Sequence, residues 1–238
     1  AYSARGTYSF KDTYMIEGNV GYTGSENFNK GQRYGLFPSI ALGWIPSQYE
    51  FFQKAVPFIS YLKFRGSYGQ VGNDRLKDVR FPYLTIVGGI GSGIWGGPAI
   101  GETQVGSTDM EWETTTKLDI GIDGKLFDNK VDFTVDFFRN KTTGVFQKRE
   151  SVPNESGLNS TLPYANIGAM TSWGFDGNAS FTQSFTKDLS ITLRGNFTLA
   201  RNKVDYWEQS NVNYPYQSYS GSPYGVLRGL ISEGLFRD

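Results

Sequence analysis

The sequence contains no cysteine and no histidine among its 238 residues. The lack of cysteine excludes disulfides and thiol nucleophiles, and the lack of histidine excludes imidazole bases and most zinc sites. Any catalytic site would have to rest on carboxylates, hydroxyls and amines alone. We therefore expect a protein that is not an enzyme and that has no cofactor or metal site.

Net charge and long apolar runs are lacking as well. Lys and Arg total 23, as do Asp and Glu, so nothing indicates attraction to nucleic acid or to anionic lipid. No apolar run approaches the roughly 20 residues of a transmembrane helix, so a membrane form of this chain must be a barrel. The chain starts without a Met or a signal peptide and stops after the apolar run 229–236, so we expect both ends to be cuts.

Aromatic side chains are abundant at 16%, and apolar and polar residues alternate with period two. In residues 14–23, for example, Ile16 and Val20 fall on one face while Glu17 and Asn19 fall on the other. The alternation predicts an all-β antiparallel fold with one apolar and one polar face. It recurs in eight segments, namely 2–11, 14–23, 34–44, 62–69, 112–126, 131–137, 173–181 and 189–199.

The dipeptide Asp128-Asn129 predicts a tight turn that fixes the register of two strands. The register places Lys125 opposite Asp132 on the polar face, which is a favourable cross-strand pair. A three-residue loop at 186–188 is needed to align the apolar faces of the last two strands. The apolar pairs expected around the first turn are Leu126–Val131, Gly124–Phe133, Ile122–Val135 and Ile120–Phe137.

Short and long connections alternate along the chain. This alternation is typical of short periplasmic turns and long extracellular loops in outer-membrane barrels. One connection on the short side is longer, and Ser47 and Glu50 have the spacing of a capping box, with Pro57 beyond. We predict a single short periplasmic helix at residues 48–55. The expected long loops are 25–33, 72–111, 141–168 and 203–225.

Two features favour a transmembrane barrel over an exported soluble β-sandwich that binds glycans or acts as an adhesin. Segment 112–126 exceeds the usual soluble strand of about 5 or 6 residues. Aromatic residues also lie near strand ends, as in barrel girdles. The sandwich stays open as an alternative, because it would bury Ile120 and Phe133 against a second sheet. The aromatic residues near strand ends are Tyr14, Tyr22, Tyr34, Trp44, Trp112 and Trp173.

A series of short motifs covers nearly the whole chain. In their order and spacing these motifs resemble the barrel of the SusC/RagA-type TonB-dependent transporters of Bacteroidota. The motifs are RYGLFPS at 33–39, GW at 43–44, EFF at 50–52, LKFRGSYGQVGN at 62–73, WE at 112–113, NIG at 166–168, WGFD at 173–176, NFT at 196–198, RNKV at 201–204, and the block 224–236.

The resemblance implies an outer-membrane barrel of roughly 22 strands, of which this chain supplies about eight or nine. Residues 1–238 would then be part of one TonB-dependent receptor β-barrel domain in contact with outer-membrane lipid. The plug domain, the TonB-contacting segment and the barrel closure would lie outside this chain. The resemblance further implies import of oligosaccharides or peptides, with a SusD-like lipoprotein over the extracellular mouth.

Aromatic residues of the expected loops are the candidates for contact with a substrate or a lid protein. Aromatic faces with polar tips suit sugars, peptides and protein partners alike, and packing between loops is an alternative role. Residues 91–96 have the spacing of a dinucleotide fingerprint, but no strand-to-helix unit surrounds them, so we expect no cofactor there. The candidates are Trp95, Tyr206, Trp207, Tyr214, Tyr216 and Tyr219.

Carboxylates on the polar face raise the question of a glycosidase pair. Asp119 and Asp123 share that face, as do Asp132 and Asp136. Basic residues lie close to them in sequence, so ion pairing in a solvated lumen explains these carboxylates without catalysis.

Overall fold

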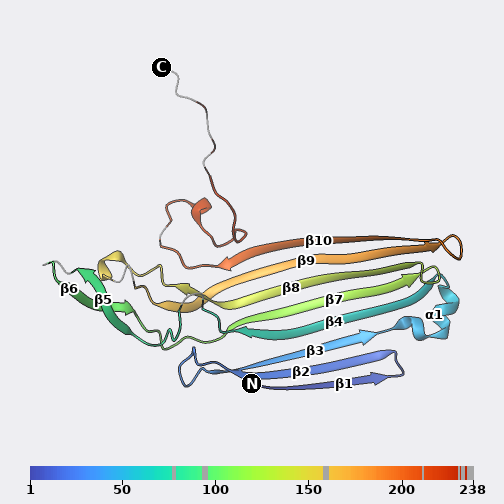
Figure 1. The fold of residues 1–238 in the computed structure, drawn as a ribbon, viewed down its shortest axis with the longest axis horizontal. Coiled ribbons are helices and arrows are strands. Elements are labelled where there is room, and N and C mark those ends of the chain that lie inside the picture. Colours follow the sequence, from blue (N-terminus) through green and yellow to red (C-terminus); the bar gives the residue numbers. More distant parts are fainter. Residues whose placement is uncertain are drawn as a thin grey trace.

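Eight strands form one antiparallel sheet in a computed structural model that describes residues 1–76, 79–92, 96–157, 161–210, 212–229, 231 and 234. Their order is β1-β2-β3-β4-β7-β8-β9-β10, with β1 and β10 at opposite edges (Figure 1). The predicted all-β antiparallel fold is confirmed. The strands are β1 (Tyr2–Phe10), β2 (Tyr14–Gly24), β3 (Tyr34–Trp44), β4 (Ile59–Asn73), β7 (Glu113–Leu126), β8 (Val131–Lys148), β9 (Tyr164–Ser184) and β10 (Ser190–Tyr206).

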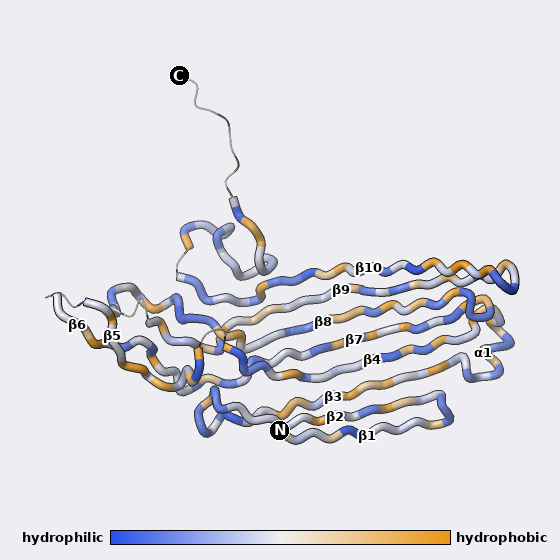
Figure 2. Tube along the Cα trace, viewed as in Figure 1, coloured by the Kyte–Doolittle hydropathy of each residue, from blue (hydrophilic) through white to orange (hydrophobic). Residues whose placement is uncertain are grey.

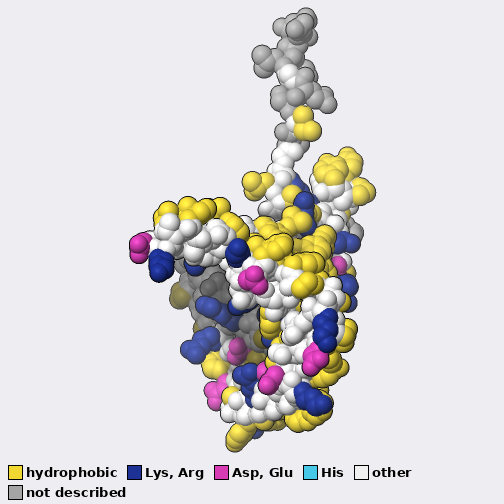
Figure 3. Space-filling model, turned by 90° about the vertical axis from the view of Figure 1, so that its right-hand side faces the viewer, with side chains coloured by type: hydrophobic (Ala, Val, Ile, Leu, Met, Phe, Trp, Pro, Cys, Tyr) yellow, Lys and Arg dark blue, Asp and Glu magenta, His cyan; other side chains and the backbone are white. Residues whose placement is uncertain are grey.

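The apolar face of the sheet is its exposed face. Along β3, Leu36 is 59% exposed and Leu42 is 56% exposed, while the alternate residues Phe37, Ser39 and Ala41 are half-buried. Figure 2 shows the alternation of hydropathy along the strands, and Figure 3 shows hydrophobic side chains along the outer edge of a curved wall. Within the described residues no second sheet covers this face. The sandwich alternative is therefore wrong, because a sandwich buries its apolar face.

The predicted strand registers are confirmed. All four apolar pairs expected between β7 and β8 are present, from Leu126 opposite Val131 to Ile120 opposite Phe137. The three-residue loop at 186–188 also forms, since the Phe185 N–H donates to the Leu189 carbonyl at 2.9 Å. At the β7–β8 turn the positive φ angles fall at Phe127, Asp128 and Asn129.

The tight turns and the long loops lie at opposite ends of the sheet. Figure 1 shows α1 (Glu50–Ala55) and the short turns at one end, and the long loops at the other. This matches the predicted separation into a periplasmic and an extracellular end. Of the helices in the described part of the chain, none has the length and apolar character to cross a membrane.

The periplasmic helix differs from the prediction in its start and its cap. The 3-10 helix η1 (Pro46–Gln48) and then α1 replace a single helix at 48–55. Ser47 does not cap a helix, because its buried hydroxyl accepts a hydrogen bond from the Leu62 N–H at 3.0 Å and donates to the Leu62 carbonyl at 3.3 Å. The Ser47 hydroxyl is therefore bonded to the backbone of β4 instead of to the first turn of the helix.

The predicted loops 25–33 and 72–111 correspond to the β2–β3 and β4–β7 connections, whereas the predicted loops 141–168 and 203–225 lose residues to strands. Residues expected to form a Gly-rich loop instead form a hairpin of β5 (Ile86–Ser92) and β6 (Pro98–Gln104). The strands β8, β9 and β10 also run on into the segments expected as loops. A bulge at Gly144, whose φ is 68°, shifts the β8–β9 register and interrupts the alternation that would have marked the extension. The remaining loops carry the 3-10 helices η2 (Asn154–Ser156) and η3 (Pro215–Gln217).

Candidate mouth site

A small buried cluster holds the extracellular loops in place. Phe28 is 0% exposed and Met110 is 1% exposed, and Leu76 completes the cluster. Trp112 packs against Phe28 with ring centroids 5.3 Å apart, and its indole N–H donates to the carbonyl of Arg33 at 3.1 Å. The β2–β3 and β4–β7 connections are thereby fixed to each other at the end predicted to be extracellular, which makes a defined surface there.

Beside this cluster lies a pocket of about 420 Å³, which we call the mouth pocket. Its apolar lining is Leu76, Val79, Val145, Phe146 and Met170. Its aromatic and polar lining is Tyr164, Trp207, Tyr224, Gln147, Arg75, Lys148, Glu113 and Glu150. Met170 shares its face of β9 with Asp176 and Ser180, so the pocket opens on the polar, lumen side of the wall.

An ion pair between the half-exposed Arg149 and the buried Glu208, which we call the loop latch, joins two loops beside the mouth pocket. The side chain of Glu208 is 9% exposed and accepts from Arg149 Nε at 3.1 and 3.3 Å. The Ser151 hydroxyl also donates to Glu208. The loop that carries Glu208 closes at its base, where the Val204 N–H donates to the Ser222 carbonyl at 2.9 Å. The latch therefore holds the neighbouring Trp207 at the pocket.

Of the five predicted contact residues that the structure describes, one lies in the mouth pocket. Trp207 lines it, whereas Tyr206 is the last residue of β10 and is 51% exposed outside it. Tyr214 and Tyr216 stack on each other with ring centroids 5.5 Å apart, and both are exposed. Tyr219 packs against the Arg228 guanidinium, 5.1 Å from its ring centroid.

The remaining predicted residue, Trp95, lies outside the described residues. Sequence reasoning missed Gln147, Tyr164 and Met170, which fell inside the expected loop 141–168 or at its edge. The strand was not predicted as far as Gln147, because the bulge at Gly144 breaks the period-two signal of β8.

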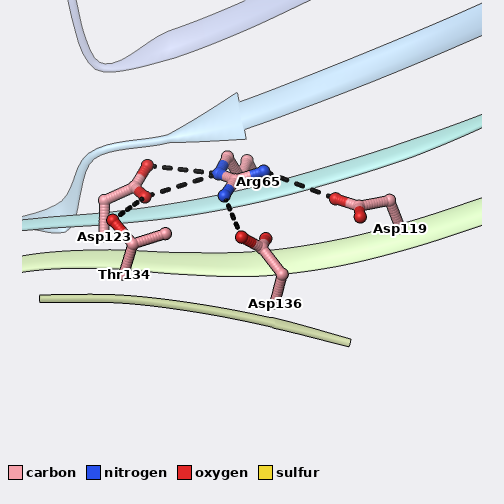
Figure 4. Close-up of polar contacts among 5 residues, drawn as sticks. All are labelled: Arg65, Asp119, Asp123, Thr134 and Asp136. Atoms are coloured by element: carbon pink, nitrogen blue, oxygen red, sulfur yellow. Dashed lines mark hydrogen bonds and ion pairs between the residues drawn. The ribbon is translucent and has the colours of Figure 1, made fainter. Parts of the chain in front are cut away.

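The carboxylates of the polar face gather around one arginine (Figure 4). Arg65 Nη2 donates to Asp136 at 2.6 Å, its Nε donates to Asp123 at 3.2 Å, and its Nη1 lies 3.4 Å from Asp119. Thr134 adds a hydrogen bond to Asp123 at 3.1 Å. The cluster spans β4, β7 and β8 and ties three strands together on the lumen side.

Ion pairing was the predicted role of these carboxylates, and the structure confirms it. The central partner is Arg65, a residue that the sequence reasoning placed on the polar face without assigning it to the carboxylates. The cross-strand pair of Lys125 and Asp132 also forms, at 3.7 Å.

Comparisons with known proteins agree with this geometry. Residues 1–230 match the family described as TonB dependent receptor-like, beta-barrel. The chain is 31% identical over 240 residues to TonB-dependent receptor P39 of Formosa agariphila, which covers 98% of this chain and 22% of that protein. It is 26% identical over 211 residues to TonB-dependent receptor SusC of Bacteroides thetaiotaomicron, which covers 86% of this chain and 20% of SusC.

Solved structures share the fold. The RagAB peptide importer in its closed-closed state superposes with a TM-score of 0.74 at 22% identity, over 87% of this chain and 22% of that chain. Its open-open state gives a TM-score of 0.73 at 22% identity, over 86% and 22%. This chain thus spans about a fifth of the length of the relatives it matches. Together with the open antiparallel sheet and its exposed apolar face, the family match shows that the chain belongs to the TonB-dependent receptor-like β-barrel family of the outer membrane.

Proposed function

We propose that residues 1–238 form part of the wall of one barrel domain of roughly 22 strands. In this proposal the plug, the TonB-contacting segment and the strands that close the barrel belong to other parts of a longer protein. The chain's share of the matched relatives, 22% of TonB-dependent receptor P39, supports this division. The open edges of β1 and β10 would then pair with further strands of the same barrel.

The full-length protein, in this proposal, imports nutrients across the outer membrane with energy passed from TonB. The observation that carries it is the mouth pocket, which opens on the lumen side at the extracellular end of the wall. An importer must first hold its substrate at this end, and concave sites with a mixed apolar and polar lining are where proteins bind small ligands.

Oligosaccharides or peptides are the proposed substrates, and a SusD-like lipoprotein is the proposed partner over the mouth. The similarity to the RagAB peptide importer supports peptides, and the resemblance of the sequence motifs to SusC/RagA-type transporters supports oligosaccharides and the lid lipoprotein. The stacked and exposed pair of Tyr214 and Tyr216 offers a rigid aromatic surface of the kind that is enriched at protein interfaces.

Uptake by living cells tests the proposed transport. The gene for the full-length protein is deleted in the source bacterium, and uptake of labelled peptides and labelled oligosaccharides is compared before and after complementation. We expect one class to lose uptake on deletion, to regain it on complementation, and to lose it again in a strain without TonB. Unchanged uptake of both classes after deletion contradicts the proposal.

The partner is tested by purification in mild detergent from the same cells. We expect a SusD-like lipoprotein to remain bound to the tagged full-length protein. Its absence, while the barrel itself is recovered intact, contradicts this part of the proposal.

A further inference from the structure

The apolar face of the main sheet carries few charges, and those it carries are positive. On the periplasmic side of the Gly144 bulge, four charged residues fall on this face at the paired strand positions that the structure describes. The carboxylates at these paired positions point to the lumen instead, as those around Arg65 do. The zero net charge of the chain gives no sign of this separation. The four cations, which we call the basic patch, are Arg139, Lys141, Arg201 and Lys203.

The strand registers place these cations side by side. Arg139 of β8 and Arg201 of β10 both lie opposite Trp173 of β9. One row further toward the long loops, the two lysines of the basic patch both lie opposite Thr171. Neighbouring strands are about 4.8 Å apart and each residue rises about 3.4 Å, so the four Cα atoms mark a field of about 10 by 7 Å. Side chains as long as those of arginine and lysine can converge on one group above a field of this size.

The basic patch begins where the apolar band of the wall ends. The row below it consists of Phe137, Phe175 and Leu199, which face outward. Arg139 stands eight residues above the start of β8. That separation is about 27 Å along a strand, or about 20 Å of membrane depth at a tilt of about 40°. This depth approaches the apolar band of about 25 Å in outer-membrane barrels, and Trp173 is of the residue type that forms the girdle at its boundary.

The charges of the basic patch are not neutralised within the described residues. None of the four cations forms a salt bridge there, and all four are exposed. A carboxylate beside the patch, that of Asp205, accepts a hydrogen bond from the Thr171 hydroxyl and balances one of the four charges at most. The patch therefore keeps an excess of positive charge at the membrane boundary, where it attracts anionic head groups.

Phosphate is the anion that this set of side chains suits best. An arginine guanidinium can donate two parallel hydrogen bonds to a phosphate, and a lysine adds a flexible point charge. Trp173 is 41% exposed between the two arginines, and its ring offers an apolar surface at head-group level. An acidic protein segment is a weaker match, because the basic patch directly adjoins the apolar face that contacts lipid.

We propose that the basic patch binds the phosphate groups of an anionic lipid of the outer leaflet. The two arginines hold the phosphates, the two lysines strengthen the attraction, and the acyl chains lie along the apolar row of Phe137, Phe175 and Leu199. The bound lipid anchors the outer ends of β8, β9 and β10 in the membrane. This site is independent of what the full-length protein imports.

Lipid binding by the purified full-length protein tests the basic patch. Affinities for lipid A with two phosphates and for phosphatidylcholine are measured in a neutral detergent by native mass spectrometry. The double variant Arg139→Gln/Arg201→Gln is compared with the control Lys117→Gln/Arg194→Gln. The control removes the same charge from the lumen face, where Lys117 and Arg194 form no salt bridge within the described residues.

We expect lipid A to bind about tenfold more tightly than phosphatidylcholine, and high salt to weaken its binding. Each basic residue strengthens binding to an anionic lipid surface about fivefold, so Arg139→Gln/Arg201→Gln should weaken lipid A binding about twentyfold. The lumen control should bind lipid A as the unmodified protein does. Arg139→Lys/Arg201→Lys keeps both charges and should retain most of the affinity. The urea midpoint in lipid-free detergent should be the same for all variants.

Four results overturn the proposal. The first is equal affinity of the unmodified protein for the two lipids, a comparison that needs no variant to fold. The second is lipid A affinity that is unchanged in Arg139→Gln/Arg201→Gln or equally reduced in the lumen control. The third is a lower urea midpoint of Arg139→Gln/Arg201→Gln without lipid, which would show a structural role. The fourth is binding of poly-L-glutamate in place of lipid A, which would assign the basic patch to an acidic protein segment.

Discussion

At the scale of single residues, Gly121 makes room for the Arg65 cluster. It lies opposite Arg65 on β4 and opposite Asp136 on β8. A Cβ atom at this position would lie 2.7 Å from Arg65 Cζ and 2.9 Å from Arg65 Nε, so the guanidinium would have to leave its place. The absence of a side chain at residue 121 therefore allows three carboxylates to share one cation.

The substitution Gly121→Ala should lower the free energy of unfolding of the full-length protein by about 2 kcal/mol, through overpacking and the displaced ion pairs. Urea unfolding in detergent micelles measures the change. Gly18→Ala is the matched control, because nothing lies within 4 Å of a Cβ there. Equal effects of the two substitutions would show that Gly121 has no special role.

The sequence predicted part of this cluster. Alternation along the strands correctly placed Arg65 and the three aspartates on the polar face, because side-chain direction follows from period two. It did not predict that Arg65 reaches Asp119, Asp123 and Asp136 together. That choice depends on the lateral order of β4, β7 and β8 and on the gap at Gly121, both of which are tertiary features.

At the scale of elements, the β7–β8 turn depends on residues that tolerate positive φ. Asn129 has a φ of 66°, where branched side chains are disfavoured. Asn129→Val should destabilise the full-length protein by about 1–2 kcal/mol, while Asn129→Gly should not. Urea unfolding of both variants measures the difference, and a Val variant as stable as the Gly variant would contradict the turn geometry.

The loop latch predicts a local effect. Glu208→Gln removes the charge that holds Arg149 while keeping the size of the side chain. We expect proteolytic cleavage within residues 209–217 to become about tenfold faster, with the global urea midpoint unchanged, because only this loop opens. Glu155→Gln, an exposed change in the partner loop, is the control. Equal cleavage rates in both variants would exclude the latch.

The strands of the main sheet were predicted from the sequence, and the hairpin β5–β6 was not. Period two is strong where one face meets lipid and the other meets water. The hairpin is rich in glycine and forms a separate sheet of two strands, so it carries no such signal. The continuation of β8 beyond Gly144 was missed because a bulge shifts the register there.

At the scale of the whole molecule, the exposed apolar face is the lipid-contacting surface. Ile120 lies near the middle of β7 and is 51% exposed on this face. Ile120→Arg should destabilise the full-length protein in lipid vesicles by about 2–4 kcal/mol. Ser67→Arg is the control on the polar face, where Asp119 lies opposite on β7. Urea titration in vesicles compares the two, and equal stability would contradict the assigned orientation.

The fold class and the orientation of the wall were predictable from alternation, but the mouth pocket was not. Its lining comes from segments as distant as Arg75 and Tyr224, which loops bring together at the end of the sheet. Trp207 was predicted as a contact residue because it is an aromatic residue in an expected loop. Gln147 was not, since an amide side chain in an expected loop carries no such signal.

The most direct test of the central claim is the environment of four consecutive residues of β3. Single cysteine substitutions at Ser39, Ile40, Ala41 and Leu42 carry a nitroxide label in the full-length protein in lipid bilayers, and collisions with oxygen and with a water-soluble nickel complex are measured. We expect oxygen, which concentrates in lipid, to dominate at Ile40 and Leu42, and the nickel complex to dominate at Ser39 and Ala41. Equal accessibility at all four positions, or the reverse pattern, would contradict a wall whose apolar face meets the membrane.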